Sequence, residues 1–324
     1  MPVYLLSRSV QAALVLIFMS FLCYVMIGLM PGDPIDIMLA ANPEATAEDA
    51  ARLRAVYGLD QPLFSRYLAW LKDALSGDFG YSRLFSQPVG DLILSRLYHT
   101  AVLIGSALCL ALLIALPAGI HAARRKDHMI DRVINLSCFA GISIPAFWLA
   151  LLCISLFSVT LGWLPAGGFA RDGAGIGTVL SFLILPVITL AFATIAGYTR
   201  YMRAAMIESL QQDHIRTARA KGCSEKRIIV HHALPSALPP VITVLSLDFG
   251  TLFGGALITE TVFARPGMGK LIYDAILGND YNLAVLSLMT VTIAILIGNL
   301  LADLSYVALD PRITLNQKRG AYDR

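Results

Sequence analysis

Charged residues are scarce in this chain. Aspartate, glutamate, lysine and arginine make up 15% of its 324 residues, whereas an average soluble protein carries about 25%. The deficit is concentrated in runs of roughly twenty apolar residues, the length that a helix needs to cross the core of a bilayer. The composition therefore argues against a soluble protein and predicts a helical membrane protein with several spans.

Cysteine and histidine are few as well, and their spacing fits neither a metal site nor a catalytic site. The five cysteines are widely separated, which is typical of reduced, packed thiols rather than of a disulfide framework. The six histidines fall at the edges of apolar runs or in polar loops. We therefore expect no cofactor or metal in this chain and no nucleic-acid partner. A membrane enzyme is the least favoured class.

One glycine-rich stretch, residues 266–270 (PGMGK), looks like a phosphate-binding loop but lacks two of the residues that such a loop requires. The pattern needs a glycine five residues before the Gly-Lys pair and a serine or threonine after the lysine. Here Ala264 and Leu271 occupy these two positions. We expect no ATP binding by this stretch.

Six apolar segments are long enough to cross a membrane, which predicts an all-α polytopic fold with six transmembrane helices. The third segment is interrupted by Gly141 and Pro145, and Pro145 should kink it because proline removes a backbone donor. A cleaved signal peptide is the alternative for the first segment. Its apolar core would be about 7–15 residues long, so we expect a retained helix instead. The predicted spans cover approximately residues 10–30, 100–120, 133–161, 178–198, 238–259 and 283–309.

A mixed polar region, residues 31–97, separates the first two spans and has the pattern of an ordered helical insertion. Thr46, with Asp49 three residues later, predicts the start of a helix that runs from Ala47 to Tyr57. A second amphipathic helix begins after Pro62, and its apolar stripe needs the tops of the membrane helices to bury it. The predicted division is a first span in 1–30, this external insertion in 31–97, a transmembrane core in 98–310 and a tail in 311–324.

Lysine and arginine are divided unevenly between the two sides of the predicted spans. One side holds Arg8, the loops at 121–132 and about 200–236, and the tail, with sixteen basic residues in all. The other side holds nine, and six of these lie in the long insertion, where the rule that relates charge to orientation is weak. The charge-rich side is predicted to be the cytosol, with both termini facing it.

The long polar loop contains two short helical patterns that meet at Gly222, a natural left-handed stop. Asp213 can cap the first pattern and Ser224 the second. Small side chains would let the surface of a partner approach the backbone closely, and basic ones would set the docking by charge. We interpret the loop as a docking element that fits into the surface of another protein. A solvated cytosolic loop is the alternative. Small and basic residues alternate at Ala218, Arg219, Ala220, Lys221 and Gly222.

This loop resembles the cytosolic motif of ABC importer permeases, written as E-A-A, three residues, G, nine residues, I-x-L-P. The triplet Arg216-Thr217-Ala218 takes the first place, Gly222 falls in register, and His232-Ala233-Leu234-Pro235 closes the motif at the same spacing. The first two residues of the triplet and the isoleucine differ, so no role of the acidic first residue carries over. The variant RTARAKG is similar to the form of the motif in the dipeptide/oligopeptide permease branch. Relatives of that branch also transport nickel and glutathione.

Other segments resemble the same branch and together span nearly the whole chain. They are residues 31–34 (PGDP), 58–62 (GLDQP), 77–80 (GDFG), and 260–263 (ETVF) running into 266–269 (PGMG). The resemblance implies the type I ABC importer permease fold in the bacterial inner membrane, with six spans and cytosolic termini.

The resemblance also implies partners and a mechanism. A homologous second permease would complete the translocation path, two cytosolic ATPases would bind ATP and magnesium, and an external solute-binding protein would dock on 31–96 and 263–283. Membrane lipid would surround the spans, and the solute would be a dipeptide, an oligopeptide or a related compound. The implied ATPase-coupling residues are Asp213, Arg216, Thr217, Ala218, Arg219, Ala220, Lys221, Gly222, Leu234 and Pro235.

Asp248 is an acid inside the fifth predicted span, and intramembrane charge is a functional hypothesis by default. It supports the alternative of a self-contained, ion-coupled secondary transporter. We expect Ser143, Pro145, Asp248 and Glu260 to lie near the translocation path, because polar or backbone-breaking residues in spans usually face the interior. Ordinary helix packing remains the alternative for these four.

Overall fold

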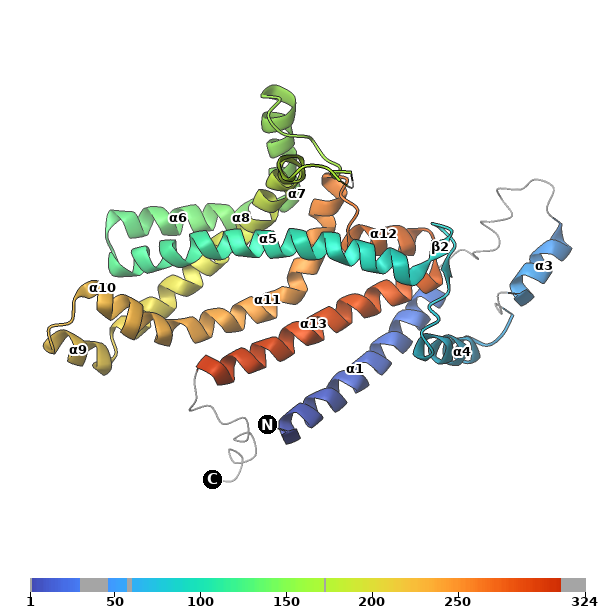
Figure 1. The fold of residues 1–324 in the computed structure, drawn as a ribbon, viewed down its shortest axis with the longest axis horizontal. Coiled ribbons are helices and arrows are strands. Elements are labelled where there is room, and N and C mark those ends of the chain that lie inside the picture. The colour runs from blue at the N-terminus through green and yellow to red at the C-terminus, as the bar shows by residue number, and fades with distance from the viewer. Residues whose placement is uncertain (1, 30–45, 57–59, 172, 310–324) are drawn as a thin grey trace.

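The computed structural model describes residues 2–29, 46–56, 60–171 and 173–309, and these residues are almost entirely helical (Figure 1). Within them, five helices are long and apolar enough to cross a membrane, and a bent pair of helices supplies a sixth candidate span. The predicted all-α polytopic fold is confirmed. The five spans are Leu6–Gly28, Val89–Arg124, Ile176–Leu210, Glu225–Ser246 and Tyr281–Leu301.

Most of the helices that form these spans lie broadly along the longest dimension of the molecule (Figure 1). Several continue beyond the predicted apolar runs, because polar residues at both ends of a run extend the same helix. The elements of the bundle are α1 (Pro2–Gly28), α5 (Val89–Arg124), α6 (Met129–Ser143), α8 (Ile176–Leu210), α11 (Leu234–Val262) and α13 (Tyr281–Leu309).

The third span is broken rather than gently kinked. After α6 ends, α7 (Ala146–Cys153) and the π-helical η1 (Ile154–Thr160) leave at a bend of 96°. Ile144, the residue before the proline, has an extended backbone with φ −83° and ψ 119°, as expected next to the proline ring. Pro145 therefore has a larger effect than the predicted kink, because the segment after it turns away from the direction of α6 (Figure 1), while α7 still packs against α8 and the end of α11.

Short elements gather at one end of the bundle, which we call the α4 end. They are α3 (Ala47–Val56), α4 (Leu63–Leu75), the antiparallel hairpin β1 (Tyr81–Ser82) and β2 (Gln87–Pro88), and α12 (Met268–Leu277). The predicted helix start at Thr46 is confirmed. The Thr46 backbone N–H donates to Asp49 Oδ2 at 3.0 Å, and the Asp49 N–H donates to Thr46 Oγ1 at 3.3 Å. The first of these bonds is the main reason that the pKa of Asp49 lies below its usual range.

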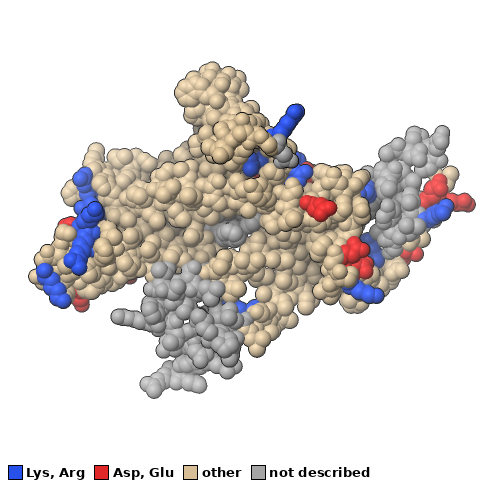
Figure 2. Space-filling view, viewed as in Figure 1, with Lys and Arg blue, Asp and Glu red and all other residues tan. Residues whose placement is uncertain are grey.

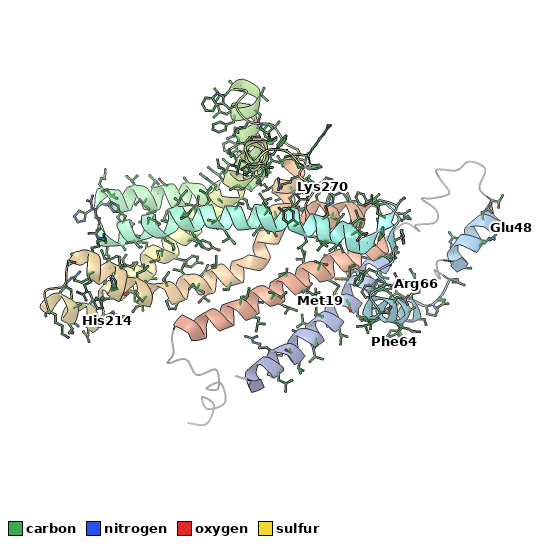
Figure 3. All side chains as sticks on the ribbon, in the orientation of Figure 1. Met19, Glu48, Phe64, Arg66, His214 and Lys270 are labelled. Atoms are coloured by element: carbon green, nitrogen blue, oxygen red, sulfur yellow. The ribbon has the colours of Figure 1, made fainter. Side chains whose placement is uncertain are left out.

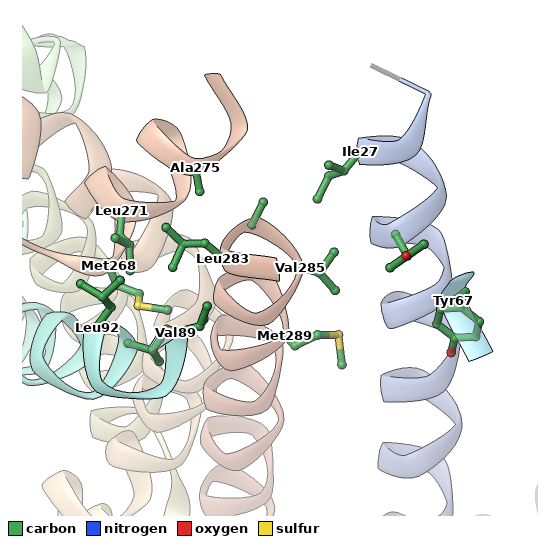
Figure 4. Packing of buried hydrophobic residues seen from close by; sticks show 13 residues of the cluster. Ile27, Tyr67, Val89, Leu92, Met268, Leu271, Ala275, Leu283, Val285 and Met289 are labelled. Carbon is green, nitrogen blue, oxygen red and sulfur yellow. The ribbon is translucent and has the colours of Figure 1, made fainter. Parts of the chain in front are cut away.

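The predicted apolar stripe of α4 packs onto the end of α1 in part, because Tyr67 and Leu71 lie inward whereas Phe64 and Leu68 are exposed. Tyr67 of α4 is buried, and its ring meets the rings of Tyr24 and Phe21 on α1 edge to face. Its hydroxyl lies 2.9 Å from Ser20 Oγ. The same buried cluster continues through the start of α5, α12 and the start of α13 (Figure 4), so these elements, α1 and α4 form one packed body. Its other members include Ile27, Val89, Leu92, Met268, Leu271, Ala275, Leu283, Val285 and Met289.

The most extensive helix pair is α5 with α8, and glycine allows their closest approach. A Cβ built on Gly119 would lie 2.7 Å from Met202 Cβ and 2.8 Å from the backbone oxygen of Thr199. Real side chains do not make such contacts, so α5 and α8 meet backbone to backbone at this position. Small residues serve this purpose in membrane helices, where close backbone packing is a main source of association.

Gly119→Ala is expected to lower the melting temperature of the detergent-purified protein. The added methyl group would push α5 and α8 apart, and overpacking costs about 1–3 kcal/mol. Gly105→Ala in the same helix is the matched control, because an added Cβ there meets no atom within 4 Å. Alanine favours a helix over glycine by about 1 kcal/mol, so this variant should be as stable as the parent or more so. Equal melting temperatures for the two variants would contradict the close packing.

Candidate partner-coupling site

The predicted motif forms a two-helix protrusion at the end of the bundle opposite to α4, which we call the α9 end (Figure 1). The chain leaves α8, forms α9 (Asp213–Ala220), α10 (Glu225–Arg227) and the π-helical η2 (Ile228–Ala233), and enters α11 directly. We call residues 213–235 the motif segment. His214 marks it in Figure 3, and Lys270 marks the start of α12 in the same view.

Gly222 ends α9 in the left-handed conformation that its position predicts, with φ +78°. The Cys223 N–H donates to the carbonyl of Ala218 at 3.2 Å, and the Gly222 N–H donates to that of Arg219 at 2.9 Å. These two bonds make a Schellman motif, which pairs the carbonyl groups that a helix end leaves open. A Cβ built on Gly222 would meet no atom of this chain within 4 Å. Glycine is needed here for its backbone angle and not for lack of space.

The predicted cap at Asp213 is wrong by one residue. Gln212 occupies the cap position, and Asp213 is the first residue of α9. From inside the helix its carboxylate cannot reach back to the first free N–H groups, so it pairs with the Arg216 guanidinium instead. A negative charge in the first turn still favours the helix dipole. Ser224 does precede α10 at the cap position, although its side chain makes no capping hydrogen bond.

The motif segment is anchored to the bundle by apolar side chains. Ile215 of α9 is fully buried, and Ile228 and Ile229 of η2 join the same cluster. Ser209 near the end of α8 donates its hydroxyl to the carbonyl of Ala233 at 2.9 Å, in a buried position. The motif segment is therefore packed against α8 and α11. The cluster also contains Ala123, Met202, Ala205, Met206, Ala218, Ala237 and Val241.

Ala218 differs from the expectation that all the small residues of the motif leave room for a partner. It is only 5% exposed and faces the bundle, whereas Ala220 and Gly222 are exposed. Ala218 is small because α9 lies close to its own chain. The helix repeat decides this, since Ala218 falls three residues after the buried Ile215 on the same face of α9.

The outward face of the motif segment is polar and basic. Lysine and arginine gather on this end of the molecule in Figure 2. Arg219 Nε lies 3.2 Å from Glu225 Oε1, and both side chains are about half exposed, so their pairing contributes little to stability. This face offers charge and close backbone access to another protein. It includes Asp213, Arg216, Thr217, Arg219, Ala220, Lys221, Gly222 and Pro235, all exposed, with Leu234 half-buried beside them.

An ion pair with a buried carboxylate fastens the start of α6 to α8, and sequence reasoning missed it. Arg203 Nε and one of its terminal nitrogens lie 2.5 and 2.7 Å from the two carboxylate oxygens of Asp131. Asp131 also accepts hydrogen bonds from the Asp127 backbone N–H at 2.9 Å and from the Asn135 amide at 2.8 Å. The start of α6 is thereby tied to the part of α8 that carries the motif segment. The two partners are 72 residues apart, so no local pattern indicates the pair.

Of the four residues expected near the translocation path, the three with described side chains do not form one cluster. Ser143 and Pro145 are exposed at the break between α6 and α7, and the Ser143 hydroxyl donates to the carbonyl of Phe139 at 2.8 Å. Glu260 is fully buried near the end of α11. Asp248 belongs to α11, and its side chain lies outside the described part of the molecule. Among the described residues, no three His, Cys, Asp or Glu side chains gather as a metal site requires.

Two family descriptions match the chain and together cover almost all of it. "Binding-protein-dependent transport system inner membrane component" matches residues 115–315. "Binding-prot-dependent transport system membrane comp, N-term" matches residues 1–104. The first match includes the motif segment, the break at Pro145 and Glu260, and the second includes α1 and the hairpin.

Curated proteins are similar over nearly their full length. The oligopeptide transport system permease protein AppB of Bacillus subtilis is 40% identical over 97% of this chain and 99% of its own. The glutathione transport system permease protein GsiC of Escherichia coli K12 is 36% identical over 96% of this chain and 98% of its own. The structure also resembles the MetNI methionine ABC transporter in an inward-facing conformation, with a TM-score of 0.56. That likeness covers 69% of this chain and 99% of the other at 19% identity, and it concerns the fold.

Ala218→Leu is expected to destabilise the detergent-purified protein, because the larger side chain must fit between α9 and the bundle. Overpacking of this kind costs about 1–3 kcal/mol. Ala220→Leu makes the same change on the exposed face of the same helix and should leave the melting temperature within error of the parent. A thermal melt of both variants tests the inward position of Ala218, and a reversed order of stability would show that α9 faces the other way.

Proposed function

The chain belongs to the family of inner membrane components of binding-protein-dependent transport systems, and we propose that it is the peptide-translocating permease of an ABC importer. It is a multi-pass protein of the inner membrane. The observation that carries the proposal is the motif segment, a basic protrusion with an exposed glycine turn that is anchored on α8 and α11 at one end of the bundle. Such a feature fits a permease that receives its driving force from separate subunits.

The partners follow from this role. Two cytosolic ATPases would receive the α9 face of this chain and of a homologous second permease, and they would bind ATP and magnesium. A solute-binding protein would dock at the α4 end. This places the α9 end and both termini in the cytosol, which agrees with the excess of basic residues on that side.

Motion of the ATPases would reach the spans through packing. Because Ile215, Ile228 and Ile229 are buried against α8 and α11, α9 and η2 cannot move without those helices. The Asp131–Arg203 pair extends the same body to α6. Displacement of the motif segment would therefore rock α6, α8 and α11 together, which is alternating access by rigid-body motion.

The solute is a peptide or a compound built like one. AppB is named for oligopeptide transport and GsiC for glutathione, which is itself a small peptide. In such a system the binding protein delivers the solute, and the permease provides a path that it can cross. Ser143, Pro145 and Asp248 remain our candidates for residues beside that path. Glu260, the fourth residue expected there, is fully buried and bonded to Thr100 and to the Lys270 N–H of α12.

Variants of Gly222 test the contact with the ATPases. Gly222→Val should reduce both the amount of ATPase that co-purifies and the rate of ATP-dependent uptake. A β-branched residue is a conformational outlier at positive φ, and the cost at a glycine turn is about 1–2 kcal/mol. Gly222→Asn is the matched control for the turn itself, because asparagine tolerates the left-handed region, and it should retain more association and uptake than Gly222→Val. Unchanged association and uptake in Gly222→Val would contradict the coupling role.

Uptake in liposomes separates an ATP-driven importer from an ion-coupled transporter. The complete complex with its binding protein should accumulate a labelled oligopeptide only when ATP is supplied on the α9 side. This chain alone should accumulate none under a proton or sodium gradient. Gradient-driven uptake by the chain alone would overturn the proposal and would direct attention to Asp248.

A further inference from the structure

The glycine-rich residues 266–270, which resemble a phosphate loop, enclose a carboxylate of the chain itself. Glu260, near the end of α11, is fully buried beside them. A Cβ built on Gly267 would lie 1.9 Å from Glu260 Cδ. The carboxylate therefore fills the space that any side chain at position 267 would need.

The carboxylate joins α11 to α12, which follows it in the sequence, and to α5, which lies 160 residues away. One oxygen accepts a hydrogen bond from the hydroxyl of Thr100 on α5, and the other accepts the Lys270 backbone N–H at 3.2 Å. Thr100 Oγ1 in turn accepts the Met268 N–H at 2.7 Å. The first N–H groups of a helix have no partner within it, so Glu260 and Thr100 cap α12.

The backbones of α11 and α12 are closely packed around this junction. A Cβ built on Gly269 would lie 2.7 Å from the Cα of Leu257, so the start of α12 touches the backbone of α11. The Arg265 backbone N–H donates to the carbonyl of Glu260 at 2.7 Å. Thr100 is fully buried. Any movement of this end of α11 must therefore carry the start of α12 with it.

The other end of α12 is fastened to the hairpin of the insertion. Asp280, directly before α13, is buried and accepts hydrogen bonds from the Ser82 hydroxyl at 2.6 Å and from the Leu84 backbone N–H at 2.9 Å. Between the two junctions α12 exposes the apolar side chains of Tyr273 and Leu277, which lie one turn apart on one face. The helix thus presents a fixed surface at the α4 end of the molecule.

One helix connects this surface to the motif segment. α11 begins at Leu234, within the motif, and is continuous to Val262, two residues beyond Glu260, although it changes direction along its length (Figure 1). We propose that Glu260 and Thr100 are positioning residues that make α12 follow α11, so that the state of the ATPases reaches the surface where the binding protein docks. This inference rests on the proposed function and names the two residues that would connect the motif segment to the docking surface of the binding protein.

ATP hydrolysis by the purified complex in lipid nanodiscs tests the link, measured over a range of binding-protein concentrations. Thr100→Val keeps the shape of the side chain and removes the hydroxyl that joins Glu260 to Met268. We expect basal hydrolysis to stay within twofold of the parent. Stimulation by the binding protein should fall at least fivefold, and the half-saturating concentration should rise. Thr100→Ser retains the hydroxyl and should restore both.

Thr189→Val is the matched control, because Thr189 on α8 is almost as buried as Thr100 and lies outside the junction. It should leave the stimulation unchanged.

If Thr100→Val does not assemble, Glu260→Gln decides by the same criteria, since it keeps the side-chain shape and removes the charge. Normal stimulation in the assembled variant would overturn the inference. A parallel loss of basal and stimulated hydrolysis would also overturn it, because that pattern marks a structural role alone. If the parent chain assembles with no ATPase, the proposed function itself fails, and this inference fails with it.

Discussion

The structure depends on the need to pair every backbone N–H and carbonyl group inside the bilayer, where water cannot do so. Long helices satisfy this need along most of the chain. At the ends of helices, specific groups take over the pairing. Gly222 closes α9 with two backbone bonds, and Glu260 with Thr100 closes the start of α12. The break at Pro145 removes a donor at a position where the chain changes direction. The irregular places are therefore the ones at which helices meet or change direction.

Buried carboxylates are also paired with hydrogen-bond donors, and they lie near the ends of the described helices. Asp131 with Arg203 binds α6 to α8 at the α9 end, and Asp280 binds the hairpin to α13 at the α4 end. Each of these carboxylates accepts several hydrogen bonds, which offsets the cost of removing it from water. Both ends of the molecule are consequently stiff, and α11 runs between them. A chain built in this way is suited to transmit displacement from one side of a membrane to the other.

Local patterns in the sequence predicted the features that depend on neighbouring residues. The apolar runs predicted the spans, Pro145 the interruption, Thr46 the start of α3 and Gly222 the left-handed turn. Features that depend on distant residues could not be predicted. Asp131 pairs with a residue 72 positions away, and Thr100 bonds to one 160 positions away. The helix repeat places Ala218 on the same face of α9 as Ile215, but which face turns inward depends on where α8 and α11 lie. The placement of Asp213 was wrong because a shift of one residue moves a side chain from a cap into the helix.

The central claim is that this chain works only as part of a complex, with its α9 face held by ATPases. The most direct measurement is the native mass of the assembly that a tagged copy of this chain brings out of its own membranes in mild detergent. The account predicts a particle with this chain, one homologous permease and two ATPase copies. A particle that contained this chain alone, under conditions in which related complexes stay together, would contradict it.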